Sequence, residues 1–339
     1  MMEIKEKLRK LVDEDVFQRY FEDAIFLDDS ILLADKFRAD RVRKNYAQEL
    51  TSAFGVEPKF GFQEQKKMAE NPKKKKSGVI EFPFWPVQKR FAPNVLLRSA
   101  VFTATHNKRR YLDSEVIGQQ HGYNVKFTGA TLDQADFDVW LQAAQIAKDS
   151  PLGTVCTIKA YDFLKSIGRK PSGGGPIYEW LTKSIARLQS SVVHVPIGPN
   201  TWKRINLIVE TEGNDETKEI EICFSPNIIK LFAANDWTAL QWEERKALKG
   251  KPLALWLHGY YSSHAKPLPI KIETLLKLSG SETKEIKHFK AALKRAFKAL
   301  EKVAGFKARF EKDLVHVERC PSPTQAKFLK KKKKPNKRK

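Results

Sequence analysis

The residues with the clearest potential for chemistry are the lysines and arginines on one side of a predicted helix. From residue 281 to residue 304, apolar side chains recur with the period of an α-helix. Basic side chains fall on the opposite face: Lys284, Lys287, Lys294, Arg295, Lys298 and Lys302, with His288 beside them. Such a helix packs on a core through its apolar face and presents positive charge outward. These side chains could bind phosphate groups and donate hydrogen bonds to guanine.

A predicted hairpin follows this helix. Residues 306–310 and 314–317 have the pattern of two short strands joined by a tight turn. A basic helix closed by a hairpin is typical of a winged helix, in which the helix enters the major groove of DNA. Three other interpretations of the basic face remain open: a solvated surface, a helix on a membrane surface and a helix held in a calmodulin-like groove.

One short segment contains residue types that could support DNA nicking. Tyr260 and Tyr261 could act as nucleophiles, and His258 and His264 flank them. Nicking also needs a histidine-bound metal ion, but two histidines six residues apart on a helix face different directions. We therefore expect the tyrosines to be core and rim residues, and we predict no catalytic residue.

No other motif indicates a metal or a cofactor. Cys156, Cys223 and Cys320 are far apart, so they form neither a metal-binding pair nor a disulfide framework. The glycines at 173–175 are not followed by the Gly-Lys-Ser/Thr of a phosphate-binding loop. The sequence thus predicts no metal site and no cofactor.

The composition favours a polyanionic partner. The chain has 339 residues, with 62 Lys and Arg against 40 Asp and Glu, which gives a formal net charge of +22. Nucleic acid is the commonest partner of such an excess. Lysine runs at 73–76 and 330–334 could bind any phosphate backbone weakly. Because the sequence has no bilayer-spanning apolar run and no secretory signal, we expect a soluble cytoplasmic protein without membrane contact.

Changes in composition divide the chain into five segments. We predict a small α/β domain, a basic proline-rich linker, two winged-helix domains and a disordered basic tail, at residues 1–62, 63–94, 95–225, 226–320 and 321–339. The linker carries an apolar patch, Phe82, Phe84 and Trp85. It either packs on the next domain, which we favour, or forms an exposed partner-binding peptide.

The two winged-helix segments repeat one plan of three helices and a hairpin. The helices are expected at 133–148, 158–167 and from 176 in the first segment, and at 252–263, 273–278 and 281–304 in the second. The expected strands are 101–103, 123–128, 192–195, 204–211 and 218–224, then 268–272 and the closing hairpin. The repeat is architectural, with little residue identity. The predicted fold class is α+β, with two tandem winged-helix domains after a small α/β domain.

Several segments from Pro93 onward carry a family resemblance. They are NVLLRSAVFT ahead of the basic HNKRR, then SPLG, LWLHGYYSSH, PIKIET and DLVH, at residues 94–103, 106–110, 150–153, 255–264, 269–274 and 313–316. Over about residues 93–320 the chain resembles the TrfA-type iteron-binding plasmid replication initiators. The resemblance implies a bacterial, plasmid-associated initiator without enzymatic activity. Such a protein binds double-stranded DNA at direct repeats (iterons) of the plasmid origin and helps to melt adjacent AT-rich DNA.

The resemblance also implies protein partners. Family members recruit host replication proteins, among them the replicative helicase and the initiator DnaA. They also self-associate, because monomers bind the origin and dimers limit copy number. Many carry a Gln-Leu-x-Leu-Phe-like peptide that touches the sliding clamp. Residues 77–86 stand in that place here, without the glutamine and with Pro83 inserted, so clamp binding is left without support.

A second resemblance concerns the N-terminal segment. Residues 17–21 (FQRYF) and 30–34 (SILLA), with the following Phe37, Val42 and Tyr46, look like the N-terminal domain of DnaA. That domain has a small α/β, KH-like fold and binds the replicative helicase. The resemblance implies a partner-binding role for an aromatic cluster, Phe17, Tyr20 and Phe21. An unrelated small domain is the alternative.

The candidate DNA-binding residues fall into two groups. The last helix and its start contribute Lys284, Lys287, His288, Lys290, Lys294, Arg295 and Lys298, and the first winged helix contributes Arg169, Lys170, Lys183 and Arg187. Base contacts are expected from the N-terminal half of the last helix, and phosphate contacts from its C-terminal lysines. Two alternative functions remain: a winged-helix transcriptional regulator, and a rolling-circle nicking initiator that uses Tyr260 or Tyr261.

Overall fold

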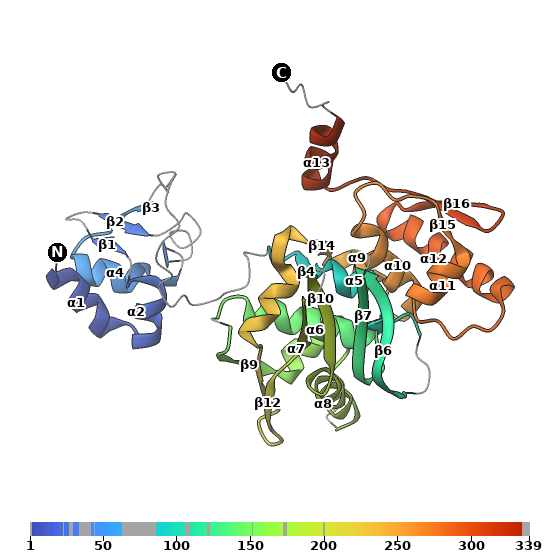
Figure 1. Ribbon diagram of the computed structural model, residues 1–339. Helices are drawn as coiled ribbons and strands as arrows, with labels where there is room; N and C mark the ends of the chain where they lie inside the picture. The colour runs from blue at the N-terminus through green and yellow to red at the C-terminus, as the bar shows by residue number, and fades with distance from the viewer. Residues whose placement is uncertain are drawn as a thin grey trace. The chain divides into compact units, whose positions relative to one another are not determined.

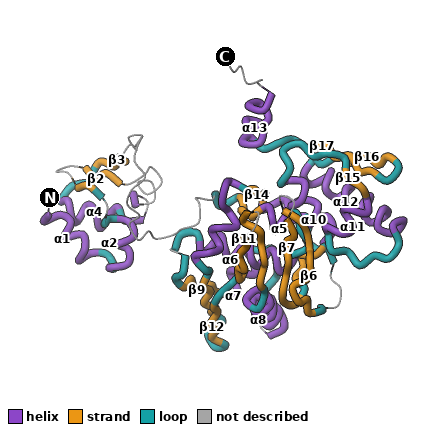
Figure 2. Tube along the Cα trace, in the orientation of Figure 1, coloured by secondary structure: helices purple, strands orange, loops and turns teal. Residues whose placement is uncertain are grey.

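The chain forms two compact units, residues 1–76 and 77–339 (Figure 1). The computed structural model describes residues 2–22, 24–26, 30–33, 42–43, 45–62, 86–105, 109–120, 123–150, 152–171, 175–198 and 201–333. The lysine run at 73–76, the apolar patch at 82–85 and the end of the tail lie outside these residues. The mixture of helices and strands confirms the α+β prediction (Figure 2).

The first unit is a three-stranded sheet packed against helices. Its elements are α1 (Met2–Leu11), α2 (Glu14–Tyr20), β1 (Ile25–Phe26), β2 (Ser30–Leu33), α4 (Ala47–Phe54) and β3 (Lys59–Phe62). β2 lies in the centre, antiparallel to β1 and parallel to β3. Leu8, Ile31 and Leu50 join helices and sheet in one core. The sequence also predicts a long amphipathic helix at 37–54, of which residues 37–41 and 44 lie outside the described residues.

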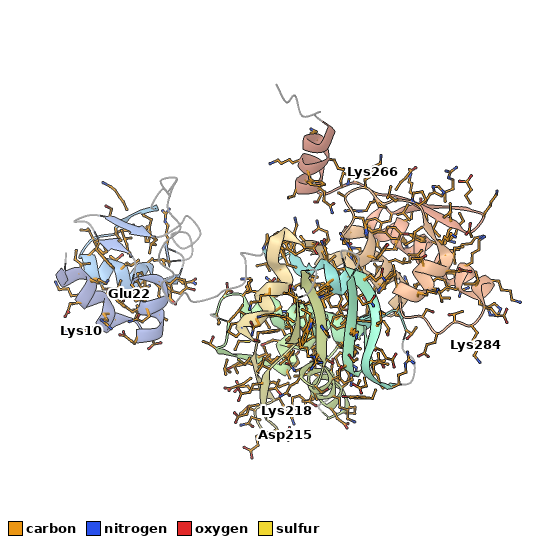
Figure 3. All side chains as sticks on the ribbon, in the orientation of Figure 1. Lys10, Glu22, Asp215, Lys218, Lys266 and Lys284 are labelled. Carbon is orange, nitrogen blue, oxygen red and sulfur yellow. The ribbon has the colours of Figure 1, made fainter. Side chains whose placement is uncertain are left out.

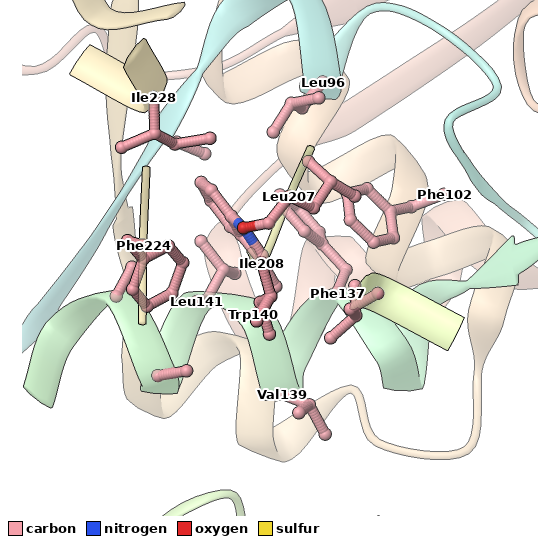
Figure 4. Packing of buried hydrophobic residues seen from close by; sticks show 14 of the residues in the cluster. Leu96, Phe102, Phe137, Val139, Trp140, Leu141, Leu207, Ile208, Phe224 and Ile228 are labelled. Carbon is pink, nitrogen blue, oxygen red and sulfur yellow. The ribbon is translucent and has the colours of Figure 1, made fainter. Parts of the chain in front are cut away.

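The second unit is built around α6 (Gln134–Ala147) (Figure 4). Asp133 begins this helix with a capping box, in which its carboxylate accepts from the backbone N–H of Ala135 and Asp136. Trp140, which α6 carries, is fully buried in the core, and its indole N–H donates to the carbonyl of Leu207 at 3.1 Å. Pairing this indole satisfies the one polar atom of a large core side chain.

One order of elements occurs twice in the second unit. The first set is β9 (Val155–Lys159), α7 (Ala160–Ser166), α8 (Gly175–Gln189), β12 (Glu210–Asn214) and β13 (Glu219–Cys223). The second set is β15 (Ile270–Lys271), α11 (Ile272–Leu278), α12 (Ile286–Ala304), β16 (Lys307–Glu311) and β17 (Leu314–Glu318). In each set the first strand pairs antiparallel with the last strand, which also pairs with the strand before it. A helix precedes each set: α6, and α10 (Pro252–Ser262).

The repeat extends to a few individual residues around the second helix. Ile158-Lys159, Leu164-Lys165 and Gly168 recur at the same spacing as Ile270-Lys271, Leu276-Lys277 and Gly280. The backbone repeats as well, because both glycines end their helices with positive φ angles of 71° and 62°. The N–H of Ala160 donates to the carbonyl of Lys218, and the N–H of Ile272 donates to that of Asp313. Each of these bonds joins the start of the second helix to the hairpin turn.

The first half of the second unit, which holds the first set, contains a four-stranded sheet, of which the sequence predicted the strands at 123–128 and 192–195 and part of a third. β10 (Val192–Gly198) and β11 (Thr201–Asn206) form a hairpin that joins β7 (Tyr123–Ala130) and β6 (Tyr111–Gln120) in a sheet of order β11-β10-β7-β6. β6 was missed because most of its side chains are exposed, so it lacks the alternation of a half-buried strand. The strand predicted at 204–211 is divided between β11 and β12, and residues 155–159 are a strand ahead of α7.

The boundary between the two halves of the second unit lies later in the chain than predicted. β4 (Lys89–Pro93) pairs with β14 (Trp237–Gln241), and η1 (Pro226–Asn235) packs beside them. Residues 226–242 therefore belong to the first core, although we had placed the boundary at 226. Apart from Ala104, the buried residues of the second core begin at Leu248, after α9 (Trp242–Ala247). Three short elements complete the fold: α5 (Asn94–Leu97), and β5 (Phe102–Thr103) paired with β8 (Leu132–Asp133).

The C-terminal segment also differs from its prediction. We expected a disordered tail from 321, but residues Pro323–Lys333 form the helix α13. Its first turn is held in place by Gln325, whose amide N–H donates to the carbonyl of Ser262 at 2.8 Å. Gln325 also accepts from the guanidinium of Arg319 at 3.0 Å.

Candidate nucleic-acid interface

The basic helix α12 begins five residues later than its periodicity predicts. Ser281 donates its N–H to the carbonyl of Leu276, which closes α11, and its hydroxyl lies 3.0 Å from that of Thr283. These bonds hold residues 281–285 in a loop, and α12 begins at Ile286. The helix ends at Gly305, which has a φ of +70°. Its apolar face is buried through Phe289, Leu293, Ala296, Phe297 and Leu300, but Ile286, which the periodicity also places on this face, is 37% exposed.

The opposite face of α12 presents basic side chains to solvent. Lys287 is 75% exposed and His288 is 65% exposed, and both lie near the carboxylate of Glu285, at 2.9 and 3.9 Å. Lys284 precedes the helix in the loop and points away from the body of the unit (Figure 3). The remaining exposed cations of this face are Lys294, Arg295, Lys298 and Lys302. The structure therefore brings this predicted group together on one surface.

Lys290 differs from the other members of the group. Its ammonium donates to the carbonyl of Lys312 in the β16–β17 turn at 2.9 Å, so it braces the hairpin against α12. Lys312 has a φ of +53° and is exposed at the turn. It was absent from our candidates, as was the exposed Arg309 on β16. The cationic character of the hairpin sequence was the available signal for both residues.

The structure removes Arg187 from the candidate interface. Its guanidinium lies 2.7 Å from the carboxylate of Asp136 in α6, and its side chain is only 19% exposed. Asp136 also accepts from the hydroxyl of Ser184 at 2.6 Å and lies 3.1 Å from Arg109. Because a buried carboxylate needs such partners, Arg187 holds α8 on α6 and is not available to DNA.

Arg169 is also engaged within the protein. Its guanidinium stacks 3.5 Å from the ring centroid of Trp180, and burial lowers its pKa. Lys170 is exposed in the loop that precedes α8. Lys183 is exposed on α8 and forms an ion pair with Glu179 one turn earlier. Of the four candidates in the first half, only Lys170 and Lys183 thus remain accessible to DNA.

The predicted partner-binding aromatics lie mainly in the core of the first unit. Phe17 and Phe21 are fully buried, so they support the fold and do not form a docking surface. Tyr20 is half-buried, and its ring packs 5.8 Å from that of Tyr46. Aromatic residues at helical spacing are found in cores as well as at interfaces, which is why the sequence pattern did not separate these roles.

The Tyr260–Tyr261 segment does not have the geometry of a nicking site. Both tyrosines are buried in α10, and burial raises the pKa of each phenol. His258 is buried and pairs with the carboxylate of Glu244 at 2.8 Å. His264 binds the Tyr260 carbonyl through Nδ1 at 2.7 Å, and its burial lowers its pKa to about 4. These contacts are those of packed core residues.

Within the described residues, no group of three or more His, Cys, Asp or Glu side chains is placed to hold a metal ion. None of the helices in the described part of the chain has the length and apolar character needed to cross a bilayer. Cys156 and Cys223 are buried free thiols, and Cys320 is exposed. The largest group of predicted DNA-binding residues that stays exposed is the cationic face of α12.

The fold and this surface define an α+β protein with a long basic helix on one face. The family model described as TrfA protein matches residues 63–319, and the chain belongs to this family. The predicted resemblance is thereby confirmed, and it begins earlier than residue 93. Residues 1–62 lie outside the matched range.

Individual proteins give further similarity. The plasmid replication initiator protein TrfA of Escherichia coli is 28% identical over 245 residues, which cover 69% of this chain and 63% of that protein. The match therefore spans less than two thirds of the relative's length. Two crystal structures of domains 2 and 3 of RctB are each 14% identical to the chain. They cover 68% and 69% of it and 99% of their own chains, with TM-scores of 0.48 and 0.45.

Proposed function

We propose that this protein is a plasmid replication initiator that binds double-stranded origin DNA at direct repeats. The observation that carries the proposal is the cationic face of α12, displayed by a chain of the TrfA family. This proposal assigns the protein no catalytic role, in keeping with the burial of Tyr260 and Tyr261.

We infer that each half of the second unit is a winged helix. The order helix, strand, helix, helix, hairpin and the pairing of the first strand with the last support this assignment in both halves. α8 and α12 are then the recognition helices, and β12–β13 and β16–β17 are the wings. β10 and β11 are inserted between the recognition helix and the wing of the first half, and they complete a four-stranded sheet with β6 and β7, which precede α6.

The proposed contacts are divided between bases and phosphates. Lys284, Lys287 and His288 lie at the start of α12, where a recognition helix meets base edges. Lys294, Arg295 and Lys298 lie further along and anchor phosphates, together with Lys312 at the wing. Lys170 and Lys183 provide the contact from the first half. Binding of this kind weakens steeply as salt rises, because each phosphate contact releases counterions.

Footprinting on the origin of the plasmid that encodes this protein tests the proposal. We expect protection of phased direct repeats beside an AT-rich stretch. A single protected palindrome would favour the rival function, a winged-helix transcriptional regulator. Metal-dependent nicking of supercoiled origin DNA, abolished by Tyr260→Phe or Tyr261→Phe, would instead support a rolling-circle initiator.

We also propose that the protein recruits host factors and self-associates. The first unit is a separate compact body with a KH-like mixture of one parallel and one antiparallel strand pair, which suits a docking module for the replicative helicase. The docking surface must be formed by residues other than Phe17 and Phe21, because these are buried. A pull-down with the full chain and with a chain lacking residues 1–62 tests this role. Equal retention of helicase by the two proteins would exclude it.

A further inference from the structure

We propose that Arg245 locks the two winged-helix halves into one rigid body, so that α8 and α12 can bind DNA only at one fixed spacing. The part of this inference that concerns DNA spacing rests on the proposed function. Its structural part concerns residues 86–333 alone. Arg245 is a positioning residue, because it lies between the halves and does not reach the DNA-binding surface.

The guanidinium of Arg245 joins three elements at the junction. It extends from α9, is 1% exposed and donates to the carboxylate of Asp138 in α6 at 2.7 Å. A second nitrogen donates to the side-chain oxygen of Gln134 in α6 at 3.1 Å, and a third approaches the carbonyl of Leu255 in α10 at 3.4 Å. The planar fork of arginine can reach both helices at once, whereas the single ammonium of lysine cannot.

Two further sets of hydrogen bonds lie at the same junction. Arg98 donates to the hydroxyl of Ser263 at 2.8 Å, and the indole of Trp256 donates to the carbonyl of Ser99 at 3.3 Å. The N–H of Ala104 donates to the carbonyl of Ser279 at 2.7 Å, and Ala104 packs in the second core, so the chain that leaves the first core is also held. Three sets of hydrogen bonds, from Arg245, from residues 98–99 and from Ala104, therefore hold the junction in one arrangement.

The charge of Arg245 also stabilises its partner Asp138. Burial raises the pKa of Asp138, and the charge of Arg245 together with its hydrogen bond opposes that rise. Removing the arginine would leave the Asp138 carboxylate, which is only 16% exposed, without its main partner. The junction would then open or admit water, and α6 and α10 would lose their common anchor.

A distance measurement between spin labels tests the lock without DNA. Lys159 and Lys271 occupy equivalent exposed positions in the two halves, so both are replaced by cysteine in a Cys320→Ser background. Cys156 and Cys223 are buried and escape labelling. We expect one narrow distance distribution for the otherwise wild-type chain, and a distribution at least about twice as wide for Arg245→Lys and Arg245→Met. An unchanged width in a folded Arg245→Lys protein would overturn the proposal, even if Arg245→Met fails to fold.

The control variant is Arg187→Lys. It weakens a similarly shielded arginine–aspartate pair, but inside the first half, so the width should stay that of the wild type. A widening as large as that of Arg245→Lys would show general loosening and would contradict a specific lock.

Origin DNA then tests the consequence. Inserting a half-turn, about 5 bp, between the two protected segments of one site should reduce the wild-type footprint to one segment. Arg245→Lys should regain protection of both segments. Wild-type protection of both segments across the insertion would refute the fixed spacing. The absence of any footprint would contradict the proposed function but would not affect the conclusion from the spin labels.

Discussion

At the scale of single residues, basic side chains in this protein have two distinct roles that burial separates. Lys287 is largely exposed on α12, whereas Arg187 is shielded and paired with Asp136, which lies 51 residues away in the sequence. Periodicity predicted the exposed stripe of α12 because its helix has one clearly apolar face. It could not separate Arg187 from Lys183, because only the tertiary fold brings Asp136 beneath α8.

Lys287→Ala should weaken specific binding more than non-specific binding. A lost donor to a base costs about 1–3 kcal/mol of discrimination against other sequences. Titrations of origin DNA and of a scrambled duplex at one salt concentration measure the two losses. Lys298→Ala is the matched control, and we expect it to weaken both complexes equally and to reduce the salt slope by about 1. Equal losses with Lys287→Ala would rule out base reading by this residue.

His264 should make the stability of the second unit dependent on pH. Burial lowers its pKa from 6.5 to about 4, so between these values the unfolded chain binds a proton that the folded protein does not. Stability is therefore lost as the pH falls through this window, by about 2 kcal/mol from this group between pH 7 and pH 5. Urea unfolding at both pH values measures the loss, which His264→Asn should diminish. The same decrease in the variant would show that another group is responsible.

At the scale of elements, two helices end in glycines whose surroundings differ. Gly280 after α11 and Gly305 after α12 both have positive φ angles, which disfavour any residue with a Cβ atom. A Cβ on Gly280 would lie 2.8 Å from the Thr103 side chain, in the junction between the halves. A Cβ on Gly305 would meet no atom within 4 Å. The sequence predicted both helix ends, but only the fold shows that one of them is also a contact.

Gly280→Ala should therefore destabilise the protein more than Gly305→Ala. Gly305→Ala should lower the free energy of unfolding by about 1–2 kcal/mol, because alanine is strained in the left-handed backbone conformation. Gly280→Ala adds a clash with Thr103 and Ala100, which the junction can relieve only by moving. Thermal unfolding of the two variants compares them directly. Equal shifts in Tm would mean that Gly280 plays no part in joining the halves.

At the scale of the whole molecule, the sequence predicted the α+β class and the duplicated helices and hairpins. It misplaced the boundary between the halves, because β14 returns to pair with β4, more than 140 residues earlier in the chain. It also missed β6, whose exposed side chains hide its pattern. Long-range pairing of this kind leaves no local signal. The four-stranded sheet of β6, β7, β10 and β11 and the Arg245 junction could for that reason be identified only from the structure.

The central claim, that this protein initiates plasmid replication, is tested most directly by supplying it in trans. A DNA circle that carries only the plasmid origin and a selectable marker is introduced into host cells with or without the full chain. We predict stable inheritance of the circle only when the chain is present, and loss of inheritance with the Lys284→Ala, Lys287→Ala double variant. Inheritance of the circle at the same frequency without the chain would contradict the account.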